Sequence, residues 1–511
     1  MSKKKQVVFK TYTPTQAFLL PPSLDELIIA THPVRVVNDV IDRINLAPLE
    51  KQYEGGGSSS YHPKMLLKVL IYGYVTNVYS SRKLEAACKE NIHFMWLAGM
   101  NKPDHHTINR FRRKRLKESL RSIFVQVVEL LASEGLLSIK EIYTDGTKIE
   151  SVANRYTFVW GKAMNTNKEK IKKQLDELWE YAKQVAAEEM SQPEPPDFTT
   201  IDSEKVKQTI EKIDAVLADK PVRKEIKQKL KYAKKNWPAA LDKYAEQEQI
   251  LDGRNSYSKT DTDATFMRMK EDHMKNGQLK PAYNIQISSS NQYIVNYSVH
   301  ANPTDTTTLP SHLDQHYEMY NQYPEAVTAD AGYGSEQNYT YMETNSIEAF
   351  VKYNYFDKQQ SEKYFKKHPF APETLHYNET KDCYYCPMGQ QMHCIGEGKR
   401  TTKNGFVQHT KKYQAKNCES CPLRGVCHDS KQNRIIEVNH KLNQIKREAH
   451  ARLNSEIGIA HRKKRCCDVE PIFGNIKGNH GFKRFLLKGN KKVSIEFGLL
   501  AIAQNLRKKA S

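Results

Sequence analysis

The segment Asp468-Val-Glu-Pro-Ile-Phe-Gly-Asn-Ile-Lys477 lies near the end of this 511-residue chain and carries its clearest helical pattern. One face of that helix is expected to be apolar and consists of Val469, Ile472, Phe473 and Ile476. Glu470 and Lys477 are separated by about two helical turns, so they share a different face. We expect Asp468 to act as the N-cap, with Pro471 tolerated in the first turn. A carboxylate and a lysine on the open face of a packed helix indicate either a solvated charge pair or a functional site.

The charge of the chain favours a nucleic-acid partner. The formal net charge is +20, and residues 461–511 alone contain 13 Lys and Arg against 3 Asp and Glu. Such a basic field attracts a polyanion, with nucleic acid the first candidate and an anionic membrane surface the second. No apolar run approaches ~18 residues, and the start Met-Ser-Lys-Lys-Lys lacks the apolar segment of a signal peptide. We therefore expect no membrane association and a cytoplasmic location.

The order of patterns along the chain predicts a mixed α/β protein with inserted segments. Residues 1–135 read as short helices with a basic last helix, which is typical of a helix-turn-helix-like DNA-binding domain; a helical domain with a solvated basic face is the alternative. Residues 136–355 alternate strands and helices, interrupted at 165–250 by a charged helical insert that reads as a hairpin with solvated faces. A cysteine-rich insert at 356–440 precedes residues 441–511, which are expected to complete the core with the terminal helix and a basic tail.

Within the predicted core, strand-like runs alternate with helical ones. Residues 141–152 read as a strand in which Asp145-Gly146 is a possible turn, and residues 282–288 and 292–300 read as a hairpin. The later elements are a helix at 305–320 and strands at 325–330 and 348–353, and the expected breaks are the Gly/Ser run 55–60 and the proline-rich run 193–197.

Three acidic residues are candidates for a metal-dependent site. Asp145 follows the first strand-like run, Asp330 ends a later one and Glu470 opens the terminal helix. Sites in mixed α/β sheets gather at strand ends, so the three side chains can converge there. Cleaving or transferring a phosphodiester uses two divalent cations ~3.5–4 Å apart, and Mg²⁺ prefers carboxylate oxygen ligands. Because each aspartate stands beside a glycine-containing turn sequence, an ordinary turn residue is the competing interpretation.

Several short segments resemble DDE transposases of bacterial insertion sequences, in particular the insertion sequence eleven-eighty-two group. The segments similar to the catalytic ones are Tyr143–Lys148, Thr328–Gly334 and Val469–Lys477. The segments similar to the helical N-terminal domain of that group are His32–Arg35, Tyr61–Tyr72 and Pro103–Arg112.

The resemblance implies an RNase H-like mixed-sheet core in which Asp145, Asp330 and Glu470 bind Mg²⁺ or Mn²⁺. It implies a nucleoid-associated bacterial transposase that binds terminal inverted repeats, cleaves double-stranded DNA and joins the freed 3′-OH to target DNA, as a homodimer when two ends are paired. Lys477 completes the pattern Glu-x6-Lys and is expected to contact DNA. Relatives have the wider pattern Tyr-x2-Arg-x3-Glu-x6-Lys, but here Lys463 and Cys466 occupy the Tyr and Arg positions. Arg465 is one residue before the Arg position and is only a candidate for the DNA contact that this arginine makes. The other expected DNA contacts are Lys483, Arg484, Arg110, Arg112 and Arg113.

Two alternatives stay open: a nuclease of the same fold without strand transfer, and a non-catalytic DNA-binding zinc protein derived from a transposase. The segment Ser258–Ala264 resembles a further acidic motif of the group, with Thr262 where proline is usual. Its Asp261 and Asp263 are expected either to support the site or contact DNA, or to form a helix cap or Asx turn.

The cysteines predict a structural zinc site in a zinc-ribbon-like insert. Two segments, Cys383-Tyr-Tyr-Cys386 and Cys418-Glu-Ser-Cys421, have the spacing of zinc knuckles and together supply four thiolates. The gap between the knuckles exceeds the usual ~15–20 residues, and a long hairpin would absorb it. The alternative ligands are Cys394 and Cys427, and free or redox-active thiols are the alternative to zinc. Nine cysteines, six of them between residues 383 and 427, fit a reducing compartment better than a disulfide framework.

Overall fold

The computed structural model describes residues 22–53, 60–185, 201–269, 277–402 and 404–511. By its internal contacts the chain divides into two units, one ending at Ser119 and including Asn505–Ser511, the other Leu120–Gln504. The sequence predicted the first boundary at residue 135, but α7 (Leu120–Ser133) belongs to the second unit, where Phe124 packs edge-on against Tyr297. The expected breaks at 55–60 and 193–197 lie outside the described residues, apart from Ser60.

The first unit is helical, as predicted. Its elements are α1 (Pro33–Asp42), α2 (Ala47–Glu50), α3 (Pro63–Val75), α4 (Ser81–Glu90), α5 (Ile92–Leu97), α6 (His105–Lys114) and η1 (Arg115–Lys117). Helix α3 is buried along most of its length and forms the centre of the unit. The last carbonyl groups of a helix have no partner within it, and here Arg507 supplies one. Its guanidinium donates hydrogen bonds to the carbonyl oxygens of Tyr74 at 2.8 Å and Val75 at 3.0 Å.

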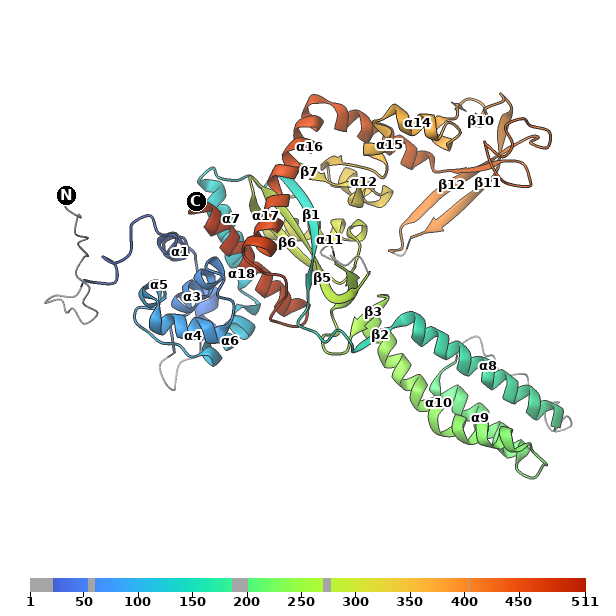
Figure 1. Ribbon diagram of the computed structural model, residues 1–511, viewed down its shortest axis with the longest axis horizontal. Coiled ribbons are helices and arrows are strands. Elements are labelled where there is room, and N and C mark those ends of the chain that lie inside the picture. The colour runs from blue at the N-terminus through green and yellow to red at the C-terminus, as the bar shows by residue number, and fades with distance from the viewer. Residues whose placement is uncertain (1–21, 54–59, 186–200, 270–276, 403) are drawn as a thin grey trace, which may run out of the picture. The chain divides into compact units, whose positions relative to one another are not determined.

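The second unit is built on a six-stranded mixed sheet. Its strands are β1 (Glu141–Glu150), β4 (Thr265–Arg268), β5 (Leu279–Ser290), β6 (Tyr293–His300), β7 (Ala326–Ala329) and β8 (Glu348–Val351). The order is β4-β5-β1-β7-β8, with β6 also paired to β5. Strand β5 is antiparallel to its neighbours, whereas β1, β7 and β8 are parallel to one another. Figure 1 labels β1, β5, β6 and β7 of this sheet. Burial without alternation along β5 shows that both faces of the sheet are covered. The predicted hairpin and the strands at 141–152, 325–330 and 348–353 are therefore confirmed.

Helices accompany this sheet. They include α11 (Leu309–Tyr320), which confirms the helix predicted at 305–320, and α12 (Glu336–Thr344). The C-terminal helices are α15 (His440–Asn454), α16 (Glu456–Asp468), α17 (Glu470–Gly474), the π-helical turn η5 (Asn475–Asn479) and α18 (Asn490–Lys509). The remaining short elements are η2 (Asp305–Thr307), η3 (Ala331–Tyr333), α13 (Phe356–Gln359), α14 (Glu362–Lys367) and η4 (Pro372–Thr374). Within the part of the chain that the structure describes, no helix has the length and apolar character needed to span a bilayer.

Two inserts have cores of their own. The first follows the short strand pair β2 (Phe158–Trp160) and β3 (Ser256–Ser258) and contains α8 (Gly161–Val185), α9 (Ser203–Leu217) and α10 (Lys224–Leu251), which run side by side (Figure 1). It is helical as predicted, but has three described helices where a hairpin was expected. The second is an antiparallel sheet of β9 (Tyr377–Asn378), β10 (Cys383–Tyr385), β11 (Gln391–Thr401), β12 (Val407–Ala415) and β13 (Ile435–Val438).

Candidate active site

Two of the predicted acids, Asp145 and Asp330, are carried by neighbouring strands of the sheet, β1 and β7. Strands β1 and β7 pair in parallel with a constant offset of 185 residues, beginning with Glu141 opposite Ala326. The pairing ends at Tyr143 opposite Thr328; continued for two more residues, the same offset leads to Asp145 in β1 and to Asp330, which directly follows β7. Asp145 is only 8% exposed, and the Oδ1 of Asp330 accepts a hydrogen bond from the Gly332 N–H at 2.8 Å. The turn expected at Asp145-Gly146 is wrong, because both residues pair with β5 in the interior of β1.

Helix α16 lies against the face that carries Asp145. Residues two apart on a strand share a face, so Tyr143 points to the same side as Asp145. The Nδ1 of His461 in α16 is 3.1 Å from the Tyr143 hydroxyl and 3.3 Å from the Thr328 hydroxyl, which fixes α16 over β1 and β7. Burial lowers the pKa of His461, so the contact is made by a neutral ring at neutral pH. One helical turn after His461, the same helix carries Arg465 to the level of Asp145.

Arg465 connects Asp145 to the third predicted acid, Glu470. Its Nη1 is 3.7 Å from the Asp145 Oδ2, and its Nη2 is 3.3 Å from the Glu470 Oε1. The side chains of Arg465 and Asp145 are 13% and 12% exposed, whereas that of Glu470 is 54% exposed. One guanidinium therefore balances a nearly buried carboxylate on the sheet and an open carboxylate at the start of α17.

A fourth acid, Asp305, lies beside Gly146, the residue that follows Asp145 in β1, and was not found from the sequence. Its Oδ1 accepts hydrogen bonds from the side-chain amides of Asn284 and Gln286, both at 2.8 Å. A Cβ on Gly146 would lie 2.7 Å from this oxygen and would also collide with Gln286. Gly146 is thus required in β1 because these two side chains fill the space next to it. Asp305 stands in a polar run, Thr304–Thr308, with no strand-end pattern to mark it.

The Tyr333 phenol is buried, and the carboxylates of Asp305, Asp145 and Asp330 are close enough to affect its ionisation. Its hydroxyl donates a hydrogen bond to the side-chain oxygen of Gln286. Burial raises the pKa of Tyr333 well above its ordinary value, the negative charges of Asp305, Asp145 and Asp330 raise it further, and Arg465 opposes them. The phenol therefore stays protonated and keeps its donor role.

The helix that follows α16 differs from the prediction at its start. The apolar stripe is confirmed at Val469, Ile472 and Ile476, which are fully buried, whereas its fourth member, Phe473, is only partly buried. The N-cap role expected of Asp468 is wrong: this residue ends α16 and is 2% exposed. Its Oδ1 instead accepts hydrogen bonds from the Ser289 hydroxyl at 2.6 Å and the Gln292 N–H at 3.1 Å. The carboxylate is used to anchor the β5–β6 hairpin, so α17 begins at Glu470 without a side-chain cap.

The residues expected to contact DNA fall into different environments. Lys483, Arg110 and Arg113 are exposed, and Lys477 lies in η5 and is half-buried. Arg484 is exposed, but its guanidinium donates hydrogen bonds to the carbonyl oxygens of Ser151 and Ala153, both at 3.1 Å. Arg112 is 4% exposed and donates to the carbonyl oxygen of Tyr79 at 2.9 Å. Because Arg112 is buried in the helical unit, it is unavailable to DNA and we remove it from the predicted interface.

The donor chemistry of the acidic group suits a hard divalent cation. Asp145, Asp330 and Glu470 offer carboxylate oxygens, and a positive group, the Arg465 guanidinium, already lies between two of them. The Nη1 of Arg465 is buried and, in the described part of the chain, forms no hydrogen bond. As the side chains stand, however, the described residues contain no group of three or more His, Cys, Asp or Glu that could hold a metal ion.

The cysteines of the two knuckles are partly brought together. A small cavity of about 20 Å³ is lined by Cys386, Cys418, Cys421 and Cys427 among other residues. Cys383 is fully buried on β10, opposite His393, and does not line this cavity. Arg434 donates to the Cys427 Sγ at 2.9 Å through its Nη1 and to the Cys418 Sγ at 3.4 Å through its backbone N–H. All nine cysteines are free of disulfide bonds.

The acidic pair at 261 and 263 has a structural role. Asp261 is 4% exposed and accepts hydrogen bonds from the hydroxyls of Ser151, at 2.5 Å, and Tyr283. The Oδ2 of Asp263 accepts from the N–H of Asn490, the first residue of α18, at 2.8 Å. A carboxylate at this point complements the positive end of the helix dipole. The helix-cap interpretation is therefore confirmed for Asp263, which caps a helix distant in sequence.

Two sequence-family models match parts of the chain. Residues 385–510 match the transposase DDE domain, and residues 22–114 match the transposase domain DUF772. The first match includes Glu470 and Lys477 but neither Asp145 nor Asp330. No curated protein and no solved structure gives a significant match to the chain. The two domain matches, together with the mixed α/β sheet, support a transposase of the DDE class.

Proposed function

We propose that this chain is the transposase of a bacterial insertion sequence of the eleven-eighty-two group. In this proposal it binds the terminal inverted repeats of its element, cleaves the DNA and joins the freed 3′-OH to target DNA. The observation that carries the proposal is the placement of Asp145 level with Asp330 while Arg465 connects Asp145 to Glu470. The strand order β5-β1-β7-β8, with β5 antiparallel and the others parallel, supports an RNase H-like core.

In this proposal Asp145, Asp330 and Glu470 hold Mg²⁺ or Mn²⁺. Two such cations, when bound, activate the attacking oxygen and stabilise the leaving oxygen of an in-line displacement. Water and then the DNA 3′-OH are the nucleophiles, so no covalent intermediate with the protein forms. The buried position of Asp145 and its hydrogen-bonded strand hold one carboxylate rigidly, whereas the exposed Glu470 can adjust to the phosphate. Lys477, Lys483, Arg110 and Arg113 are the proposed phosphate contacts, and pairing of two ends would require a homodimer.

We also propose structural zinc in the cysteine-rich insert. The cavity shared by Cys386, Cys418, Cys421 and Cys427 favours this ligand set over the one that includes Cys383. Four thiolates suit tetrahedral Zn²⁺, which would draw the two knuckle segments together. The N–H donors of Arg434 are suited to stabilise two of the thiolates.

The test of the catalytic proposal uses a duplex containing the DNA that flanks the reading frame. With Mg²⁺, the protein should cleave this duplex at the element end and join a pre-cleaved end to a plasmid. Asp330→Ala should lose nearly all cleavage and keep DNA binding. A matched control is Asp357→Ala, because Asp357 is 67% exposed and pairs only with Lys352 among the described residues.

Three outcomes separate the candidates. Cleavage and joining that both depend on Asp330 support the transposase. Cleavage without joined products supports the nuclease alternative. Sequence-specific binding in a protein whose activity is unchanged by Asp330→Ala supports a non-catalytic DNA-binding protein.

A further inference from the structure

The helical insert carries a line of exposed lysines along α10. Four of them, Lys224, Lys227, Lys231 and Lys235, recur at intervals of three, four and four residues and are all exposed. At 3.6 residues per turn these positions fall within about 80° of one another, so they form one stripe ~16 Å long. We call these four residues the lysine stripe. The apolar face of α10, which includes Leu230, Ala233 and Trp237, packs into the core of the insert and leaves the stripe at the surface.

The lysine stripe is the uncompensated part of a basic helix. Two other lysines of α10 are neutralised by acids of the neighbouring helices: Lys229 pairs with Glu177 at 2.8 Å and Lys234 with Asp214 at 2.9 Å. No ion pair within the described ranges involves any member of the stripe. Because these positive charges lie close together and no described carboxylate pairs with them, they attract a multivalent anion.

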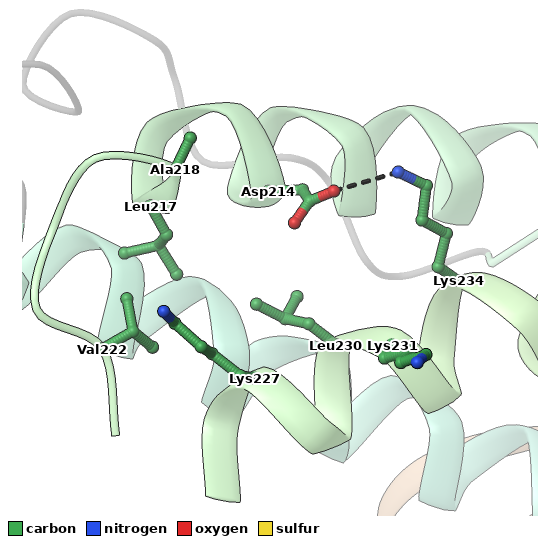
Figure 2. Close-up of a pocket in the computed structure, with 8 residues that line it drawn as sticks. All are labelled: Asp214, Leu217, Ala218, Val222, Lys227, Leu230, Lys231 and Lys234. Atoms are coloured by element: carbon green, nitrogen blue, oxygen red, sulfur yellow. Dashed lines mark hydrogen bonds and ion pairs between the residues drawn. The ribbon is translucent and has the colours of Figure 1, made fainter. Parts of the chain in front are cut away.

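A recess beside the stripe has the same charge character. A cavity of about 340 Å³ lies between α9 and α10 and is lined by Lys227 and Lys231 of the stripe and by Lys234. Figure 2 shows these side chains. Asp214 is the acid of its lining, and its carboxylate is already paired with Lys234 (Figure 2). The recess therefore keeps a net positive charge, which suits a phosphate group at its mouth.

The surface of the insert favours a nucleic acid over a protein or a membrane. Along the described parts of α8, α9 and α10, the large apolar side chains that are exposed are Tyr232 and Ile250, which are far apart in α10. A protein-docking or membrane-inserting helix would present a contiguous apolar patch, and these helices do not.

We propose that the lysine stripe binds the phosphate backbone of duplex DNA, so that the helical insert is a second DNA-binding element of the protein. This proposal rests on the proposed function, since it assumes that DNA is the substrate. The length of the stripe equals the axial rise of about five base pairs, since each strand carries one phosphate per ~3.4 Å of helix axis. Contacts of this kind position the duplex without reading its sequence.

The experiment compares two double variants with the same change in charge. Lys227→Gln/Lys231→Gln removes two members of the stripe, and Lys168→Gln/Lys229→Gln removes two lysines of the insert that are already paired with Glu248 and Glu177 and do not line the recess. Binding to a fluorescein-labelled duplex of 40 base pairs of arbitrary sequence is measured by anisotropy at several salt concentrations. We expect the stripe variant to bind about tenfold more weakly near 0.1 M salt and its log–log salt slope to fall by about 1.8, because ~0.9 is lost for each phosphate contact. The ion-paired variant should keep the wild-type slope.

Each outcome decides the proposal. Equal binding by wild type and both variants, or equal losses in both variants, would overturn the stripe as a DNA contact. Retained DNA binding with loss of binding to phosphatidylserine vesicles would overturn it in favour of a membrane surface. The assay needs no cleavage, so a loss of catalysis in Asp330→Ala does not affect it. If the wild-type protein binds no duplex at all, the proposed function fails together with the stripe. Circular dichroism and melting temperature of the stripe variant should be unchanged, since Lys227 and Lys231 are exposed.

Discussion

Replacing Arg465 with glutamine should destabilise the metal-free protein. The substitution removes the positive charge that balances the nearly buried Asp145 and the exposed Glu470. The Arg465–Asp145 pair is separated by 3.7 Å, with side chains 13% and 12% exposed. At an effective dielectric constant of ~20, such a pair is worth about 4 kcal/mol of attraction. The contact with Glu470 adds less than about 1 kcal/mol, because that carboxylate is 54% exposed.

The net loss is governed by the buried partner. Removing one member of a buried pair costs roughly 3–5 kcal/mol. The 3.7 Å separation is long for an ion pair, so we expect a loss at the lower end, about 3 kcal/mol in the free energy of unfolding. For a large domain this corresponds to a fall in melting temperature of about 6 °C.

The assay is thermal unfolding in EDTA and in excess Mn²⁺. In EDTA the variant should have a lower melting temperature than wild type. In excess Mn²⁺ the difference in melting temperature should be smaller, because a bound cation would replace the positive charge that Arg465 provided. Lys463→Gln is the matched control, since Lys463 is exposed on the same helix. A double-mutant cycle with Asp145→Asn should give a coupling energy of about 3 kcal/mol. A loss below about 0.5 kcal/mol in EDTA, the range of surface substitutions, would refute the reasoning.

Two further predictions concern the cysteine-rich insert. Hydrogen bonds from Tyr413, Lys411 and Tyr377 lower the pKa of Asp382 to about 2. Because the folded pKa is depressed, Asp382 stabilises the sheet above its ordinary pKa of 3.8 and this contribution is lost as the pH falls towards about 2. Asp382→Asn should remove that part of the acid sensitivity in a series of melting curves between pH 5 and 2, and an unchanged pH profile would contradict it. Metal analysis of protein purified with zinc should find about one Zn²⁺ per chain. The zinc should be lost in Cys421→Ser and kept in the control Cys466→Ser, whose thiol is exposed. Zinc that is still bound in Cys421→Ser would exclude the ligand set of Cys386, Cys418, Cys421 and Cys427.

Local sequence patterns predicted the elements of the second unit well, because each depends on nearby residues. The strand at 141–152 and the hairpin after residue 282 are marked by β-branched and aromatic side chains, and the stripe from Val469 to Ile476 is buried as its periodicity required. The placement of Asp330 at the end of a strand was also readable. Asp330 and Asp145 are level because of the parallel register of two strands, which no local pattern specifies.

The remaining features depend on tertiary partners. Asp145-Gly146 has the composition of a turn, but Asp305 and Gln286 fill the space beside Gly146 and keep it in a strand. Asp468 has the composition of a cap, but Ser289 and Gln292 bind its carboxylate. The role of Asp305 arises from a loop that is adjacent to Gly146 only after folding. In each case a side chain from more than one hundred residues away decides the outcome.

The hydrogen bonds from Arg507 to the end of α3 have a consequence for the order in which the protein is made. A ribosome releases the helices of the first unit hundreds of residues before Arg507, so during most of synthesis the carbonyl groups of Tyr74 and Val75 lack this donor. The first unit therefore reaches its complete form only when residue 507 has emerged, and a fragment that stops at Ser119 would have a frayed α3. Maturation of the N-terminal helices is in this way tied to the synthesis of a segment 432 residues further along the chain.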